Sequence, residues 1–312
     1  MPLISNMLGL IGRTPMVKLN KLTHQLQAHV FVKLENFNPM SSVKDRAALA
    51  MIEDAEKRKL INRDTLIIEP TSGNTGISLA FVCAVKGYKL KLVMPESMSV
   101  ERRQIIASLG AELVLTPASE GMQGAVNKAQ QLAACEKNCY IPLQFSNKAN
   151  PKTHYSTTAQ EIWEQTEGSI DIFVAGVGTG GTLSGVSKAL KMKNNELWAV
   201  AVEPASSPVI SGGKAAPHKI QGIGAGFIPE NLNVKLIDEI VQVKNEDAIN
   251  TARRLIREEG IFCGISSGAN VFAALQLAQR ADNKGKIIVT IICDTAERYL
   301  STELFNKTKF NK

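Results

Sequence analysis

Short apolar runs recur along the chain, and each is rich in β-branched residues. They occupy residues 65–70, 89–95, 111–117, 170–176, 197–204 and 286–294. Nearly continuous hydrophobicity over such short stretches is typical of strands buried on both faces. Helical patterns such as ISLAFVCAVKG, ERRQIIASLG and TLSGVSKALKMK lie between them and end at glycine or polar residues. Because strands alternate with helices, the pattern predicts an α/β fold of largely parallel, twisted sheets flanked by helices.

A chain of 312 residues exceeds the usual size of one domain, so two compact domains are expected. The segment NKANPKTHY, residues 147–155, is polar and rich in turn formers, and it lies between two groups of strand–helix units. We therefore predict an N-terminal domain of residues 1–148 and a C-terminal domain of residues 149–312, with strands within about residues 13–35 free to cross to the other domain. Each domain is expected to contain one largely parallel sheet.

The composition is that of an ordinary globular protein, with 44% hydrophobic and 21% charged residues. No apolar run approaches the roughly 20 residues of a membrane span, and the first residues do not form a secretion signal, so we expect a cytoplasmic protein without membrane contact. The formal charge of +7 is spread along the chain, and the aromatic fraction is 5%. Scattered cations and few stacking rings argue against a nucleic-acid partner.

Cysteines and histidines form no recognisable metal or disulfide pattern. The five cysteines are an odd number without a repeated C-x-x-C, and the four histidines include no H-E-x-x-H. We therefore expect no metal ion. Because no histidine lies near a G-x-S-x-G motif, a Ser-His-Asp mechanism is not supported either.

Lys44 lies in the segment NPMSSVKDRAALAMIEDAEKRKL, where Ser42 followed by Asp45 resembles the capping box that begins a helix. The pattern predicts that Lys44 lies in the first turn of that helix. The positive end of the helix dipole disfavours the charged amine, which helps a lysine that forms a Schiff base. From its position alone, however, a solvated surface lysine is the simpler interpretation.

The segment EPTSGNTG, residues 69–76, joins a predicted strand to a helix that begins near Ile77. Its two glycines, three hydroxyl side chains and asparagine resemble an anion site. The free N–H groups at the start of a helix point outward and bind anions. A simple chain reversal is the alternative.

The segment GVGTGGT, residues 176–182, has the same strand-to-helix position. It satisfies G-x-G-x-x-G, and Glu203 ends the next predicted strand, so an NAD-dependent oxidoreductase is an alternative of a different class. The hydroxyls of Thr179 and Thr182 favour instead the dianionic end of a phosphate monoester. A phosphate site is also compatible with a role for Lys44, whereas the dinucleotide interpretation gives Lys44 no role.

Taken together, these segments resemble the cysteine synthase, or O-acetylserine sulfhydrylase, family, which belongs to fold type II of the pyridoxal-phosphate enzymes. The similarity extends along nearly the whole chain. The matching segments, in order, are IGRTPMVKLN, NPMSSVKDRAA, EPTSGNTGISLA, MPESMSVERR, GAELVLTP, HYSTTAQEIW, AGVGTGGTLSGV, IQGIGAGFIP, GISSGAN and DTAERYLST.

The resemblance implies roles for residues at the matching positions. Lys44 would be the catalytic lysine that binds pyridoxal 5'-phosphate, Asn74 would bond the ring oxygen of the cofactor, and Ser266 would face its pyridine nitrogen. A neutral hydroxyl there does not force protonation of the nitrogen, which disfavours transamination. The cofactor phosphate would be bound by Gly178, Thr179, Gly180, Gly181 and Thr182. The substrate carboxylate would be bound by Thr71, Ser72, Gly73, Thr75 and Gln144.

The implied reaction is a β-replacement that makes L-cysteine and acetate from O-acetyl-L-serine and sulfide. It would proceed through an internal aldimine on Lys44 and an α-aminoacrylate intermediate, with the freed lysine amine as general base. The resemblance also implies a homodimer and a complex with the C-terminal tail of serine acetyltransferase. The closest alternative is a cystathionine β-synthase-like or O-phosphoserine-using β-replacement.

One position departs from the family pattern. Lys148 in QFSNKANP stands where family members commonly have a proline. A tolerated loop substitution is the simpler interpretation, and a preference for a more anionic substrate is the alternative.

Overall fold

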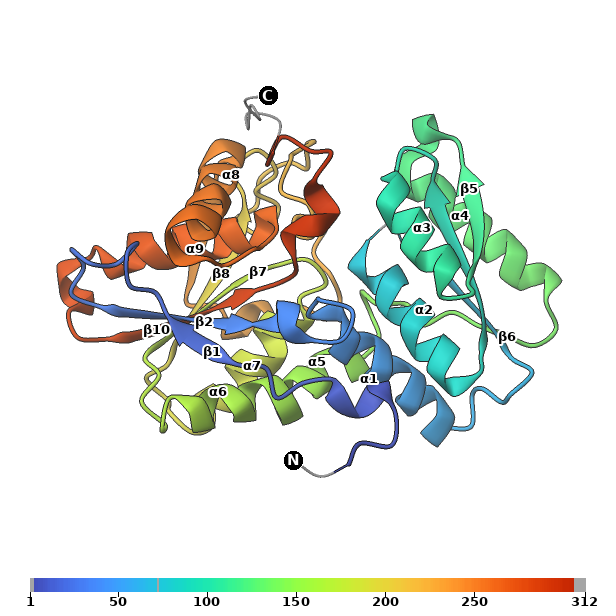
Figure 1. The fold of residues 1–312 in the computed structure, drawn as a ribbon, viewed down its shortest axis with the longest axis horizontal. Helices are drawn as coiled ribbons and strands as arrows, with labels where there is room; N and C mark the ends of the chain where they lie inside the picture. Colours follow the sequence, from blue (N-terminus) through green and yellow to red (C-terminus); the bar gives the residue numbers. More distant parts are fainter. Residues whose placement is uncertain (1–2, 72, 306–312) are drawn as a thin grey trace. The chain divides into compact units, whose positions relative to one another are not determined.

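The computed structural model describes residues 3–71 and 73–305, so Ser72 lies outside the described residues. Figure 1 shows the chain coloured from its N-terminus to its C-terminus. The chain forms two compact units: unit 1 contains Met1–Ile11 and Lys44–Asn150, and unit 2 contains Gly12–Val43 and Pro151–Lys312. Residues 12–43 thus lie in unit 2. The sequence-based division at residue 148 placed them in the N-terminal domain, with strands within about residues 13–35 free to join the other domain.

Unit 2 is built on a six-stranded sheet with the strand order β1-β2-β10-β7-β8-β9. Its strands are β1 (Met16–Lys18), β2 (His29–Leu34), β7 (Ile172–Gly176), β8 (Trp198–Pro204), β9 (Glu239–Val243) and β10 (Ile287–Ile292). β1 is antiparallel to β2, and the other neighbouring strands of this sheet are parallel. The pairing of β2 with β10 explains why residues 12–43 belong to unit 2, because it joins them to the end of the chain.

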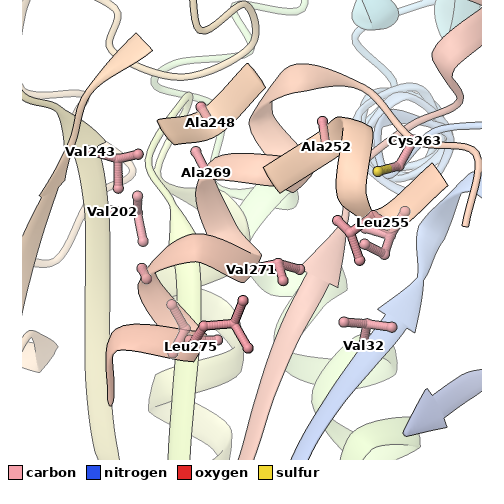
Figure 2. Packing of buried hydrophobic residues seen from close by; sticks show 14 of the residues in the cluster. Val32, Val202, Val243, Ala248, Ala252, Leu255, Cys263, Ala269, Val271 and Leu275 are labelled. Atoms are coloured by element: carbon pink, nitrogen blue, oxygen red, sulfur yellow. The ribbon is translucent and has the colours of Figure 1, made fainter. Parts of the chain in front are cut away.

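Helices cover both faces of this sheet (Figure 1). The α-helices are α6 (Ala159–Gln165), α7 (Gly181–Lys191), α8 (Asn245–Arg254) and α9 (Ile265–Ala278). The π-helical segments His154–Thr158 and Leu255–Glu259 adjoin α6 and α8, and α5 (Ala149–Thr153) lies where the chain enters unit 2. In Figure 2, apolar side chains of α8 and α9, among them Ala252, Ala269 and Leu275, meet Val32 and Val202 of the sheet. The helices α6 and α7 contribute to a second buried cluster on the opposite face.

Unit 1 contains a four-stranded parallel sheet with the order β5-β4-β3-β6. Its strands are β3 (Leu66–Pro70), β4 (Lys89–Pro95), β5 (Glu112–Thr116) and β6 (Cys139–Tyr140), and its longer helices are α1 (Lys44–Lys57), α2 (Asn74–Lys86), α3 (Val100–Ser108) and α4 (Gly121–Cys135). Ala125 and Ala129 of α4 pack against Ile68 and Val93. The side chain of Leu92 points to the other face, toward α2 and α3.

All six predicted apolar runs are strands, each within two residues of its predicted bounds. The α/β fold with two largely parallel sheets is therefore confirmed. The apolar runs did not include β1, β2, β6 and β9, although β1 and β2 lie within the residues 13–35 where strands were expected. Of these, β1 and β6 have only three and two residues, and polar residues interrupt β2 and β9 at Lys33 and Gln242.

Candidate active site

Lys44 is the first residue of α1, as the capping pattern predicted. Just before it, the N–H of Val43 donates a 2.9 Å hydrogen bond to the carbonyl oxygen of Cys293. Just after it, the buried carboxylate of Asp45 accepts a 2.5 Å hydrogen bond from the hydroxyl of Ser78 on α2. The chain is thus held on both sides of the lysine. The helix dipole at this terminus favours the neutral amine.

The turn between β3 and α2 carries the predicted carboxylate site of unit 1. Thr71 continues β3 by donating its N–H to the carbonyl oxygen of Val93 at 3.0 Å, and Asn74 begins α2. At Gly73, the residue before α2, a Cβ would meet nothing within 4 Å. The N–H groups of the first helical turn have no partner within the helix, so this turn has the donors that an anion needs.

Gln144 lies against this turn, although it is far away in the sequence. Oγ1 of Thr75 donates to Oε1 of Gln144 at 2.6 Å, and Nε2 of Gln144 donates to Oγ1 of Thr71 at 3.5 Å. All three side chains are buried. The structure therefore brings together three of the residues that were predicted to bind the substrate carboxylate.

Glu69 is a buried residue of this unit that sequence reasoning did not select as a site residue. Its carboxylate accepts hydrogen bonds from the N–H groups of Leu143 at 3.0 Å and Gln144 at 3.3 Å. Burial raises the pKa of Glu69 to about 7, and the two N–H groups oppose this rise only in part. Glu69 is the first residue of the EPTSGNTG segment, which was the available signal, but its hydrogen bonds go to a loop that this segment does not contain.

The glycine-rich loop of unit 2 joins β7 to α7. Gly176 donates its N–H to Oδ1 of Asn270 at 2.8 Å, and Gly180 adopts a left-handed conformation with φ of +79°. A Cβ at Gly180 would lie 2.8 Å from backbone atoms of Leu232. The N–H of Gly181 lies 3.4 Å from Oγ1 of Thr179. The N–H groups of the loop and the hydroxyl of Thr179 therefore lie at the positive N-terminal end of α7, where an anion is stabilised.

Gly222 links this loop to Ser266. A Cβ on Gly178 would lie 2.4 Å from the carbonyl oxygen of Gly222, and a Cβ on Gly222 would lie 3.5 Å from Oγ of Ser266. Ser266 is in the first turn of α9 and is buried. The predicted phosphate loop and the predicted partner of the pyridine nitrogen are therefore neighbours of one short segment. The motif QGIGAG contains this segment, but sequence reasoning assigned it no role.

Thr182 lies beside a buried histidine. Its Oγ1 is 3.3 Å from Nε2 of His154, and Nδ1 of His154 is 2.9 Å from Oγ1 of Thr158. The histidine lies in the π-helical segment before α6, a type of distortion that often occurs at functional sites. It came from a different part of the chain, so the spacing of the glycine loop gave no signal for it.

Glu203 has a structural role that conflicts with the dinucleotide alternative. Its carboxylate accepts hydrogen bonds from the N–H groups of Ile210 and Ser211 and from the hydroxyl of Ser211. The side chain is buried, with 1% of its surface exposed. A carboxylate that binds a ribose must present its oxygens to the ligand. The oxygens of Glu203 are instead used to fix the following loop.

The predicted site residues are divided between the two units. Unit 1 carries Lys44, Gly73, Asn74 and Gln144 with the two threonines, whereas unit 2 carries the glycine-rich loop and Ser266. Ser72, also predicted to bind the carboxylate, lies outside the described residues. Within residues 3–71 and 73–305, no group of three or more His, Cys, Asp or Glu side chains could hold a metal ion. In the same ranges, no helix is both long and apolar enough to cross a membrane.

Comparison with known sequences gives a consistent family. The sequence pattern of the family described as pyridoxal-phosphate dependent enzyme matches residues 7–294. A cysteine synthase of Staphylococcus aureus (strain Mu50) is 54% identical over 304 residues, which cover 97% of this chain and 97% of that protein.

Solved structures give the same result. A cysteine synthase from Entamoeba histolytica has a TM-score of 0.96 and 43% identity, and the match covers 100% of this chain and 93% of that one. An O-acetylserine-dependent cystathionine β-synthase from Helicobacter pylori has a TM-score of 0.90 and 40% identity, and the match covers 98% of this chain and 100% of that one.

Proposed function

Because the chain belongs to the family of pyridoxal-phosphate-dependent enzymes, we propose that it makes L-cysteine and acetate from O-acetyl-L-serine and sulfide. The observation that carries this proposal is the 54% identity to a cysteine synthase over 97% of both chains. At this identity and coverage, the Staphylococcus aureus cysteine synthase is a model for both the fold and the chemistry of the site. The residues of the two units also supply the groups that such a reaction requires.

The loop of unit 2 fits the phosphate of the cofactor. Glycine is needed at Gly178 and Gly180, where a Cβ would collide with neighbouring backbone, so the N–H groups of the loop are left accessible. Thr179 and Thr182 add hydroxyl donors, and the dipole of α7 favours a dianion. These residues, together with Gly181, would hold the phosphate.

Lys44 would hold the cofactor covalently through Nζ, with Asn74 at the ring oxygen and Ser266 at the ring nitrogen. Pyridoxal phosphate, when bound, stabilises negative charge at Cα of an amino acid and so allows the β-substituent to leave. The Nζ of Lys44 would take the proton from Cα and later return it. Its position at the start of α1 favours the neutral amine, which is the form that a base requires.

The turn of unit 1 would bind the α-carboxylate of the amino acid. The N–H groups at the start of α2 and the hydroxyl of Thr71 provide donors, and Thr75, whose hydroxyl donates to Gln144, would hold that side chain at the site. Ser72, between Thr71 and Gly73 in the sequence, would add a further hydroxyl. Gln144 lies within hydrogen-bond distance of both threonines and would complete the site. A carboxylate bound there would orient Cα toward its base, because orientation of the reacting atoms lowers the barrier.

A second acceptor is favoured by one observation. The Helicobacter pylori protein, described as an O-acetylserine-dependent cystathionine β-synthase, is 40% identical over 98% of this chain. The donor would be the same, and homocysteine would replace sulfide.

We also propose a cytoplasmic homodimer that binds the C-terminal tail of serine acetyltransferase. A peptide with the sequence of such a tail should compete with O-acetyl-L-serine, and sedimentation should give twice the mass of the chain. A monomer, or a peptide without effect on the Michaelis constant (KM), would contradict the respective part of this proposal.

The reaction is tested with the purified, cofactor-loaded enzyme. The protein is mixed in turn with O-acetyl-L-serine, O-phospho-L-serine and L-serine, and the visible spectrum and the released acid are recorded. Sulfide or homocysteine is then added, and the amino-acid product is identified. We expect O-acetyl-L-serine to change the spectrum, acetate to be released and sulfide to give cysteine. If none of the three donors changes the spectrum, the proposed reaction is wrong, whereas turnover with homocysteine alone would favour the second acceptor.

A further inference from the structure

Glu69 occupies a buried position at the end of β3, two residues before Thr71, with 2% of its surface exposed. It pairs with the apolar Leu92 on β4. Since side chains alternate along a strand, Glu69 points away from the face where Ile68 and Val93 pack against α4. A carboxylate in such a place is costly unless it makes hydrogen bonds.

Its hydrogen bonds go to the loop after β6. Oε2 of Glu69 accepts from the N–H of Leu143 at 3.0 Å, and Oε1 accepts from the N–H of Gln144 at 3.3 Å. Leu143 has a φ of +57°, a conformation that bulky residues rarely adopt. Such a conformation persists only where the surroundings determine the backbone strongly, and it often marks a functional segment. Glu69 provides this constraint from the neighbouring strand.

Gln144 is therefore held at three places. Its N–H is bound by Glu69, its carbonyl oxygen accepts a 2.9 Å hydrogen bond from Nδ2 of Asn150, and its side chain contacts Thr71 and Thr75. The last two residues lie at both ends of the turn that would bind the substrate carboxylate. A small rotation of the Gln144 peptide would move its amide away from that turn.

We propose that Glu69 is a positioning residue for the amino-acid substrate: its carboxylate fixes the Leu143–Gln144 peptide and so holds Gln144 against Thr71 and Thr75. This inference rests on the proposed function, because it takes these residues as the binding site of the substrate carboxylate. Glu69 contacts neither substrate nor cofactor in this proposal. It acts through Gln144.

The protonation state of Glu69 should then affect substrate binding. Burial raises the pKa of Glu69 to about 7. The ionised carboxylate accepts both N–H groups, whereas the neutral acid carries an O–H on one oxygen and is a poorer acceptor for two donors. The KM for O-acetyl-L-serine should therefore rise as the pH falls below about 7, the value of this pKa.

The other titratable and charged groups near Glu69 do not account for a change in KM near pH 7. Tyr140 on β6 interacts with Glu69, but burial raises the pKa of Tyr140 above 10, so this side chain stays neutral near pH 7. The buried charged residues of α1 are Asp45 and Arg46, and the buried charged residue of α3 is Arg102. Asp45 accepts a hydrogen bond from Ser78. On β4, the partner of Glu69 is the apolar Leu92.

The test compares Glu69→Gln with Glu112→Gln, which removes an exposed carboxylate from β5 of the same unit. The amide introduced by Glu69→Gln offers one acceptor oxygen and turns an NH2 group toward the second N–H. We expect Glu69→Gln to raise the KM for O-acetyl-L-serine about tenfold and to remove the rise of KM at low pH. The visible band of the bound cofactor and kcat should change little. Glu112→Gln should retain the wild-type KM and its pH dependence.

A double variant tests whether the effect passes through Gln144. If it does, Glu69→Gln combined with Gln144→Ala should bind substrate no more weakly than Gln144→Ala alone. Additive losses would overturn the inference, as would an unchanged KM in Glu69→Gln. If Glu69→Gln does not fold, Glu69→Asp retains the charge on a shorter side chain and should give an intermediate KM with the pH dependence retained. A wild-type KM in Glu69→Asp would then overturn the inference. A wild-type enzyme without a visible band or cysteine formation would instead refute the proposed function itself.

Discussion

Oγ1 of Thr75 and Oε1 of Gln144 lie 2.6 Å apart, although 69 positions separate the two residues in the sequence. The hydrogen bond joins the first turn of α2 to the loop that follows β6. Both side chains are buried, so neither can exchange its partner for bulk water at low cost. This contact holds the side chain of Gln144 against the turn that carries the predicted carboxylate site.

Replacing Thr75 with valine should weaken substrate binding. Valine has nearly the shape of threonine but no hydroxyl, so Oε1 of Gln144 loses its donor. We expect the KM for O-acetyl-L-serine to rise about tenfold, because a buried polar group without its partner costs about 1–3 kcal/mol. Steady-state kinetics with the cofactor-loaded enzyme would measure this change.

Thr116→Val is the matched control for this prediction. Thr116 is a buried threonine of unit 1 whose Oγ1 has no hydrogen-bond partner among the described residues. Its replacement should leave KM unchanged and should not lower the free energy of unfolding. If Thr75→Val and Thr116→Val had the same KM for O-acetyl-L-serine, the role assigned to Thr75 would be wrong.

Lys44→Ala should abolish the visible absorbance band of the bound cofactor and lower kcat by at least about 10³-fold, since a positioned general base alone contributes about 10² to 10⁴. Lys57→Ala, at the exposed last residue of the same helix, should retain both properties. A Lys44→Ala protein that keeps the band and the activity would show that another lysine binds the cofactor.

Gly178→Ala should weaken cofactor binding. The added Cβ would lie 2.4 Å from the carbonyl oxygen of Gly222, a backbone atom that cannot turn aside, so the glycine-rich loop must shift. We expect the dissociation constant of pyridoxal phosphate to rise about tenfold or more, because the loop N–H groups move away from the phosphate. Fluorescence or absorbance titration of the cofactor-free protein would measure it.

The control is Gly285→Ala in the same unit. Gly285 has a φ of +77°, and its Cβ would meet nothing within 4 Å. The change should lower the free energy of unfolding by about 1 kcal/mol without altering cofactor affinity. A similar loss of affinity in both variants would indicate a general loss of stability in place of a local effect.

Glu69 should make the folded protein less stable as the pH rises toward neutrality. In the unfolded chain its carboxyl group ionises near the model value of 4.5, whereas burial raises the folded pKa to about 7. Between these two values the folded state binds the extra proton. The contribution of Glu69 to the free energy of unfolding is therefore fully present below about pH 4.5 and is lost as the pH rises through about 7.

Denaturant titrations of the wild type and of Glu69→Gln at several pH values would measure this contribution. The wild-type value minus the variant value should fall across this window by an amount on the order of 3 kcal/mol. A difference that stays constant or rises with pH would contradict the raised pKa.

The local sequence determined much of this protein. Continuous apolar runs identified six strands, because a strand buried on both faces needs apolar side chains at every position. The edge strand β5 follows the same pattern, although only Thr116 of it is buried. The placement of Lys44 at a helix start was also predictable, since capping residues act within a few positions. The glycine-rich loop and the TSGNTG turn were recognisable for the same reason: their donors lie on consecutive residues.

Only the tertiary structure decided which distant residues support these segments. Residues 12–43 join unit 2 because β2 pairs with β10, and no local pattern records the partner of a strand. Glu69 belongs to the EPTSGNTG segment but bonds to the loop after β6, and His154 and Gly222 lie against the glycine-rich loop from other parts of the chain. The local sequence around each of these three residues does not indicate its role. Their roles arise from hydrogen bonds and close packing between residues far apart in the sequence, which are formed only when the chain folds.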